Sequence, residues 1–136
     1  MFSCSSSQSS SEYFLPRVSD YPVESKSSVY QYAVEAGSGI NAYVLDTGVF
    51  AGHTEFAGRL VEGPSFVSEE ELDDLNGHGT CCCGILGGTL FGAAKNVTLI
   101  PIKVLSNIGS GINSDIISGI AWAVNDKRVS FILAIF

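Results

Sequence analysis

The chain has 136 residues, of which 46% are hydrophobic and 15% charged, so it is long enough for one domain with an apolar core. Its 7 basic and 14 acidic residues give a net charge of −7 without a lysine or arginine cluster, which argues against a nucleic-acid partner. The late apolar run Val129–Phe136 is too short to cross a bilayer, which argues against a membrane partner.

The amino-terminal segment is nearly all serine over residues 3–11. Because such a composition buries little apolar surface, we expect residues 1–11 to be a disordered lead-in and residues 12–136 to fold. Residues 1–14 lack the basic start and apolar stretch of a secretory signal peptide, so no such segment is visible in this chain.

The first half of the folded part predicts a buried strand, a weaker strand and a helix. Apolar residues at Ile40–Asp46 stand between glycines and predict the buried strand, and Leu60–Val67 predicts the weaker one. The acidic segment Glu69–Asn76 predicts an exposed loop. Gly77–Leu90 is rich in small residues and predicts a helix from about His78, whose glycines require tight packing against neighbours.

The second half predicts a strand and then a longer helix. Val97–Leu105 predicts a strong strand with an irregularity at Pro101, because proline cannot donate to a strand ladder. Asn113 or Ser114 can cap a helix that runs to about Lys127. The expected apolar stripe of this helix consists of Ile116, Ile117, Ile120, Ala121 and Val124.

A third buried strand is predicted at Val129–Phe136. Strands that alternate with helices indicate an α/β fold with a parallel sheet and right-handed crossovers. In such sheets functional groups gather beyond the carboxyl ends of the strands, which is where Asp46 and His78 are expected.

Asp46 and His78 have the chemistry of a catalytic pair. A histidine can take a proton from a hydroxyl and return it to a leaving group, while a carboxylate fixes its tautomer and stabilises its charged form. Alone, a strand-end aspartate is more often a turn former or a helix cap, and a histidine in a glycine-rich turn is as often structural as catalytic. Their order along the chain makes the catalytic interpretation more specific.

Three of the four cysteines are contiguous, at Cys81, Cys82 and Cys83, and the fourth is in the serine-rich segment. A disulfide framework is therefore not expected, and we interpret these cysteines as small buried apolar side chains. An alternative places His78, Cys81 and Cys82 on one helix face as metal ligands. We predict no metal site, because no fourth ligand is evident nearby.

Asn96-Val97-Thr98 is a glycosylation sequon, which matters only if the chain enters the secretory pathway.

Several short segments occur in an order and spacing that match a known family. They are Val44–Val49, His53–Phe56 with Gly58 and Arg59, Asp74–Thr80, Gly92–Lys95, Lys103–Leu105 and Gly109–Gly111. Together they resemble the subtilisin-like serine proteases (subtilases, peptidase S8), particularly the proteinase K-like branch. The resemblance spans roughly residues 12–128.

The resemblance implies a partial doubly wound parallel sheet of about three strands and two helices, and an endopeptidase that uses an Asp-His-Ser triad. Asp46 would orient the imidazole, and His78 would act as general base and then general acid. Gly109, Ser110 and Gly111 would bind an extended polypeptide substrate by strand addition.

The resemblance also implies a secreted or vacuole-like location. No cofactor is implied for these residues; calcium belongs to the full-length family, and no calcium site can be placed here.

The sequence departs from the family at two places. Cys81 stands where the family commonly has a second histidine, Cys83 replaces an alanine, and Cys82 matches a free cysteine of the proteinase K-like branch. The Gly-Thr-Ser-Met-Ala type motif that carries the nucleophile does not occur in these residues, and the resemblance fades after about residue 128.

We therefore expect an incomplete subtilisin-like domain that does not cleave peptides alone. Its apolar end, Ile132–Phe136, would be a poorly covered strand through which the chain could self-associate. The alternatives are a non-catalytic peptide-binding fragment and, last, a Cys/His metal-binding protein.

Overall fold

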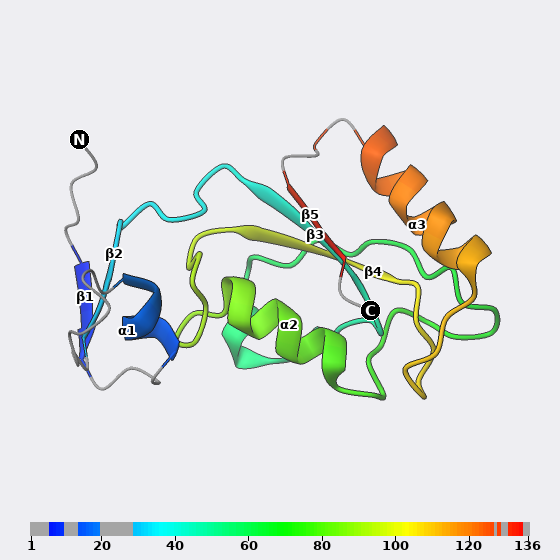
Figure 1. Cartoon of the computed structure of the whole chain (residues 1–136), viewed down its shortest axis with the longest axis horizontal. Coiled ribbons are helices and arrows are strands. Elements are labelled where there is room, and N and C mark those ends of the chain that lie inside the picture. Colours follow the sequence, from blue (N-terminus) through cyan, green and yellow to red (C-terminus); the bar gives the residue numbers. More distant parts are fainter. Residues whose placement is uncertain (1–5, 10–13, 20–28, 127, 129–130, 135–136) are drawn as a thin grey trace.

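The computed structural model describes residues 6–9, 14–19, 29–126, 128 and 131–134. Figure 1 shows its elements along the chain. They are β1 (Ser6–Ser9), α1 (Phe14–Ser19), β2 (Val29–Tyr32), β3 (Asn41–Asp46), the 3₁₀ turn η1 (Thr54–Phe56), α2 (His78–Gly87), β4 (Thr98–Lys103), α3 (Asn113–Asn125) and β5 (Phe131–Ala134). In the described part of the chain, no helix is long and apolar enough to span a membrane.

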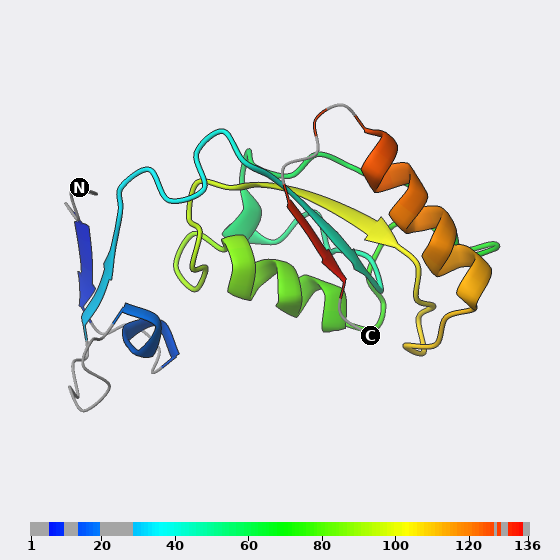
Figure 2. The same cartoon turned by 45° about the horizontal axis from the view of Figure 1, so that its top comes forward.

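A three-stranded parallel sheet with the order β4-β3-β5 forms the centre of the fold. Helix α2 covers one face of this sheet and α3 covers the other, as Figures 1 and 2 show. The predicted α/β fold class, with three strands and two helices around a parallel sheet, is confirmed.

The central strand β3 is buried on both faces because its side chains alternate between two clusters. Ala42 and Val44 pack on the α2 side in a cluster that includes Cys83. Tyr43 and Leu45 pack on the α3 side in a cluster that includes Ala123. This arrangement explains why the strand reads as a continuous apolar run.

The helices that follow β3 and β4 lie on opposite faces of the sheet, so the chain leaves the two neighbouring strands in opposite directions. A crevice is expected at the carboxyl ends of two such strands. Asp46 ends β3, and its register partner Lys103 ends β4. The fold therefore places both residues at one edge.

Pro101 lies within β4 without breaking its pairing to β3. The N–H groups of Leu99 and Lys103 point away from β3, donating to the carbonyls of Arg59 and Pro64. Pro101 falls in the same alternation, so its missing donor faces outward. The expected irregularity is absent from the β3–β4 ladder because only the outer side lacks a hydrogen bond.

The predicted strand at Leu60–Val67 is wrong. This segment makes only isolated bridges, from Leu60 to Leu99 and from Ser65 to Lys103. It follows the outer edge of β4 but cannot pair continuously there, because Pro101 offers no donor.

Helix α3 differs from expectation in its cap and its buried face. It begins at Asn113 after Ile112, without a side-chain cap, and ends at Asn125. Ile117 and Val124, predicted in the apolar stripe, are 64% and 58% exposed. The helix turns Gly119 to the sheet instead, where an added Cβ would lie 2.4 Å from Val104 Cγ1. Ile116 packs against the core as predicted, but the closest approach to the sheet is made by glycine, the smallest residue.

Helix α2 starts at His78 as predicted, and it ends at Gly87 instead of Leu90.

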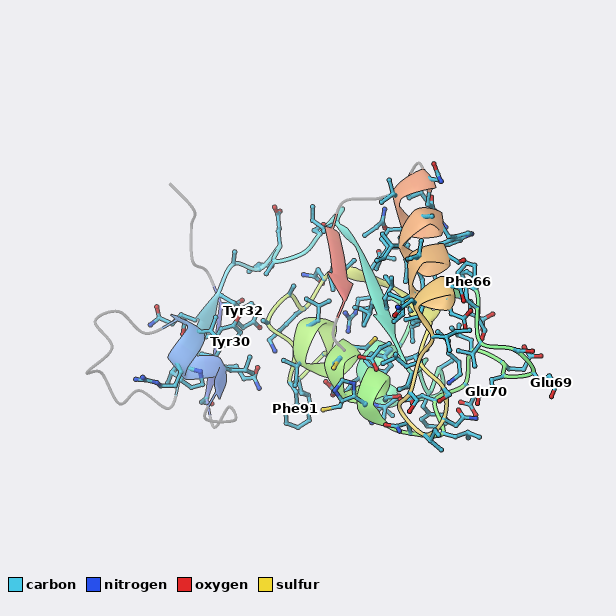
Figure 3. The ribbon with its side chains drawn as sticks, turned by 45° about the vertical axis from the view of Figure 1, so that its right-hand side comes forward. Tyr30, Tyr32, Phe66, Glu69, Glu70 and Phe91 are labelled. Carbon is cyan, nitrogen blue, oxygen red and sulfur yellow. The ribbon has the colours of Figure 1, made fainter. Side chains whose placement is uncertain are left out.

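The serine-rich segment is not entirely a disordered lead-in, because Ser6–Ser9 forms β1 and pairs antiparallel with β2. Main-chain hydrogen bonds to a neighbouring strand can hold serines in a β-strand even though their side chains bury little apolar surface. Tyr30 and Tyr32 of β2, labelled in Figure 3, stack with ring centroids 5.2 Å apart. Lys95 Nζ lies over both rings. The other residues of the predicted lead-in lie outside the described residues.

Candidate active site

Asp46 has a buried carboxylate at the carboxyl end of β3; its side chain is 1% exposed. Its Oδ1 accepts a hydrogen bond from the Thr47 main-chain N–H at 2.6 Å. His78 Nδ1 lies 2.8 Å from the same oxygen and 3.0 Å from Oδ2. The carboxylate is thus held by its own strand end and faces one ring nitrogen of His78.

His78 is the first residue of α2, and its side chain is 50% exposed. The hydrogen bond to Asp46, together with the charge of that carboxylate, raises the pKa of His78 above its ordinary value. The other ring nitrogen, Nε2, lies 4.0 Å from the Sγ of Cys82. An imidazole with one nitrogen on a buried carboxylate and the other near solvent can accept a proton from a hydroxyl.

Two glycines let the aspartate loop and the histidine helix approach each other. A Cβ at Gly79 would lie 2.3 Å from the carbonyl oxygen of Gly48. Gly48 itself has a φ of 107°, in the left-handed region that disfavours other residues. The glycine after His78 thus permits the close backbone packing expected from its motif.

Asp74 is a site residue to which the sequence analysis assigned no role. Its Oδ1 accepts from Thr47 Oγ1 at 2.8 Å and from the Gly77 N–H at 2.8 Å. Its Oδ2 accepts from the Thr80 N–H at 2.8 Å and from Thr80 Oγ1 at 2.6 Å. The carboxylate therefore joins the end of β3 to the first turn of α2 on both sides of His78.

Burial alone would raise the pKa of Asp74, but hydrogen bonds from Thr80, Gly77 and Thr47 outweigh it and lower the pKa. The signal in the sequence was an acid four residues before the histidine, at a position typical of a loop that precedes a helix.

Lys103 is a second residue missed at this edge, and its side chain is fully buried. Its Nζ donates to the Thr47 carbonyl at 2.5 Å and to Asn107 Oδ1 at 3.0 Å, and it lies 3.2 Å from Glu70 Oε2. Figure 3 shows Glu70 on the long loop that leads to α2. The buried ammonium therefore connects three segments at the carboxyl ends of β3 and β4. A lysine in an otherwise apolar strand was the available signal.

The predicted substrate-binding residues Gly109, Ser110 and Gly111 form an exposed loop after β4. Asn76, two residues before His78, donates from Nδ2 to the Asn107 carbonyl at 3.1 Å. This bond places the start of the glycine loop beside the histidine segment. Among the described residues, the main-chain N–H and carbonyl of Gly111 have no hydrogen-bond partner.

The three contiguous cysteines are free and lie in three environments: Cys81 is exposed, Cys82 half-buried and Cys83 buried. The expectation of buried apolar side chains is right for Cys83 and wrong for Cys81. Cys82 Sγ lies 3.8 Å from His78 Nδ1. Burial, with the charge of Asp46, raises the pKa of Cys82 to about 12.

The cysteines also bear on the metal alternative. Ligand atoms of Asp46, His78 and Cys82 lie within 4.8 Å of one another, and Cys81 is not part of this group. His78 Nδ1 lies 2.8 Å from Asp46 Oδ1, which is the geometry of a proton-transfer pair.

Comparison with known proteins agrees with the fold. The subtilase family (peptidase S8) matches residues 37–132. Subtilisin-like protease 6 of Trichophyton schoenleinii is 46% identical over 73% of this chain and 24% of its own length. Alkaline protease 2 of Aspergillus fumigatus is 44% identical over 70% of this chain and 19% of its own length.

A crystal structure of a cold-adapted subtilisin-like serine proteinase superimposes with a TM-score of 0.74 and 41% identity. The match covers 86% of this chain and 43% of that one. The chain spans about a quarter of the length of the Trichophyton schoenleinii protease. The family match and these identities show that the chain belongs to the subtilase family of subtilisin-like serine proteases.

Proposed function

We propose that Asp46 and His78 are the orienting carboxylate and the general base of a serine endopeptidase whose nucleophile comes from residues outside these 136. The observation that carries the proposal is the contact of 2.8 Å between His78 Nδ1 and the buried Asp46 Oδ1. It fixes the tautomer in which Nε2 is free to take the proton of a serine hydroxyl. His78 would then return this proton to the leaving amine, while Asp46 stabilises the imidazolium.

The raised pKa of His78 supports this role, because a general base must hold the proton that it receives during the reaction. Asp74 and Lys103 support it indirectly by fixing the backbone on either side of Asp46 and His78. The 136 residues contain no Gly-x-Ser-x-Gly or Gly-Thr-Ser-Met-Ala sequence, so we expect no peptide hydrolysis from them alone.

The proposal can be tested in a chimera in which residues 37–132 replace the matching segment of a complete subtilisin-like protease. We expect the chimera to cleave a peptide substrate, and Asp46→Asn to lower kcat by about 10⁴-fold because the imidazole loses its tautomer. The matched control is Asp73→Asn, which changes an exposed aspartate in the loop before α2 and should leave kcat unchanged. A folded chimera that keeps its activity with Asp46→Asn rules out the proposed role.

Sequencing the transcript beyond the codon for Phe136 gives an independent check. A downstream serine motif in frame supports the proposal, and a stop codon directly after Phe136 shows that the serine must come from another chain.

A second candidate function, peptide binding without cleavage, would use the same edge. The exposed loop at Gly109–Gly111 favours it, because Gly111 offers a main-chain N–H and carbonyl without partners among the described residues. An extended peptide can add to such groups as a strand. We expect peptide titration of the 136-residue chain to shift the NMR signals of this loop.

A matched pair of variants tests this binding. Gly111→Leu should abolish it, since even a Cβ would lie 2.7 Å from Leu105 Cδ2, whereas Ser110→Ala should retain it. No shift at millimolar peptide concentration would contradict the binding function and leave the catalytic proposal standing.

A further inference from the structure

The sequence holds a single Asn-x-Ser/Thr sequon, Asn96-Val97-Thr98, which has no part in the candidate active site. Asn96 is exposed at the end of the connection from α2 to β4, and Thr98 is the first residue of β4. An exposed sequon at the end of a connecting segment is the setting in which a bulky surface glycan can be tolerated.

The contacts of Asn96 are compatible with a modified side chain. Its main-chain N–H donates to the Ala36 carbonyl at 2.8 Å, and this bond does not involve the side chain. Its Nδ2 donates to the Val34 carbonyl at 2.5 Å. A primary amide nitrogen carries two hydrogens, and substitution of one leaves the other for Val34.

The position of Asn96 also keeps a glycan away from the catalytic pair. Strands β3 and β4 are parallel, with Asn41 opposite Thr98 at one end and Asp46 opposite Lys103 at the other. Asn96 therefore lies at the amino edge of the sheet, separated from the edge that carries Asp46 by a strand length of roughly 17 Å at about 3.3 Å per residue. A sugar attached there leaves the substrate edge open.

We propose that Asn96 is an N-glycosylation site of this chain. The reaction forms a bond between Asn96 Nδ2 and the anomeric carbon of an oligosaccharide carried on a polyprenyl diphosphate. The bond from that carbon to the diphosphate oxygen breaks, polyprenyl diphosphate leaves, and Nδ2 loses one proton to a base of the transferase. No electrons are exchanged, and the site does not depend on proteolytic activity.

The test is to translate the full chain behind a cleavable signal peptide in the presence of microsomes, and to select translocated chains by their protection from added protease. We expect one upward shift in apparent mass, which N-glycosidase removes while converting Asn96 to Asp, as mass spectrometry can detect.

Variants at Thr98 separate the sequon from the fold. Thr98→Val keeps the side-chain shape but removes the hydroxyl, so the shift should be lost although Asn96 retains its bond to Val34. Thr98→Ser keeps the hydroxyl and should retain the shift, and Asn96→Gln should lose it. Protected wild-type chains without a shift, or a shift that persists in Thr98→Val, would overturn the proposal.

Discussion

The main-chain N–H of Gly79 donates to the Oγ1 of Thr47 at 2.9 Å, so the residue after the acid holds the residue after the histidine. Thr47 Oγ1 in turn donates to Asp74. The contact between Asp46 and His78 is therefore braced by a parallel connection through their neighbours. The braced pair and its surroundings lead to predictions that can be tested on the chain itself.

Replacing Asp46 with asparagine should lower the pKa of His78, because the hydrogen bond and the charge that raise it both depend on the carboxylate. The chain has two histidines, so an NMR titration resolves His78 with His53 as an internal reference. An unchanged His78 titration in a folded Asp46→Asn protein would show that the carboxylate does not set this pKa.

The same pair predicts a pH dependence of stability. Since the pKa of His78 is raised in the folded state, protonation stabilises the fold fully below the unfolded-state pKa of about 6.5. This contribution is lost as the pH rises through the higher folded-state value. Urea midpoints measured against pH should show this loss in the wild-type chain and not in His78→Gln.

Asp74→Asn should destabilise the chain, because both carboxylate oxygens accept hydrogen bonds and an amide would turn its NH₂ toward one set of donors. A buried donor that loses its hydrogen-bond acceptor costs about 1–3 kcal/mol of unfolding free energy. Asp73→Asn, at an exposed position, is the control. Equal urea midpoints for the two variants would contradict the bracing role.

The pKa of Asp74 is lowered by its hydrogen bonds, which outweigh the effect of burial. Its contribution to stability is therefore complete above the unfolded pKa of about 3.9 and is lost as the pH falls through the lower folded value. The difference in stability between the wild-type chain and Asp74→Asn should shrink under strongly acidic conditions.

Two glycine substitutions in α2 should have opposite effects. Gly79→Ala places a Cβ 2.3 Å from the Gly48 carbonyl oxygen and should cost about 1–3 kcal/mol through overpacking. Gly84→Ala meets no atom within 4 Å and should stabilise the helix by about 0.5–1 kcal/mol. Thermal unfolding followed by circular dichroism measures both, and a stabilising Gly79→Ala would refute the close contact.

Thiol labelling should follow the burial of the three contiguous cysteines. Cys81 is exposed and should react first, whereas burial raises the pKa of Cys82 and of Cys83 to about 12. Because the thiolate is the reactive form, both should label slowly until the chain unfolds. Mass spectrometry of a Cys4→Ser variant, alkylated with and without urea, gives the order. Labelling of Cys83 as fast as Cys81 in the folded chain would contradict this burial.

The parallel sheet was predictable because β3 and β4 are apolar runs separated by a helix, and the strand-end acid marked the functional edge. The apolar stripe of α3 was not, since a surface helix is oriented by its closest contact. At Gly119 this contact excludes a side chain. Of the predicted isoleucines, Ile116 packs against the core, whereas Ile117 and Ile120 are exposed.

The site was predictable in its central pair but not in its supports. Asp46 and His78 stand out through local glycines and apolar neighbours, while Asp74 and Lys103 act through segments distant in sequence. The role of Lys103 could not be predicted from its strand, because nothing in the local sequence shows that Glu70 and Asn107 surround its ammonium group.

The outward-facing proline of β4 gives the sheet two unequal flanks. The flank at Pro101 offers no donor at its centre and is already followed by the segment from Leu60 to Ser65. At the other flank, β5 pairs with β3 on one side, and no described strand pairs with its second side. Addition of a further strand to this sheet is therefore disfavoured beside β4 and favoured beside β5.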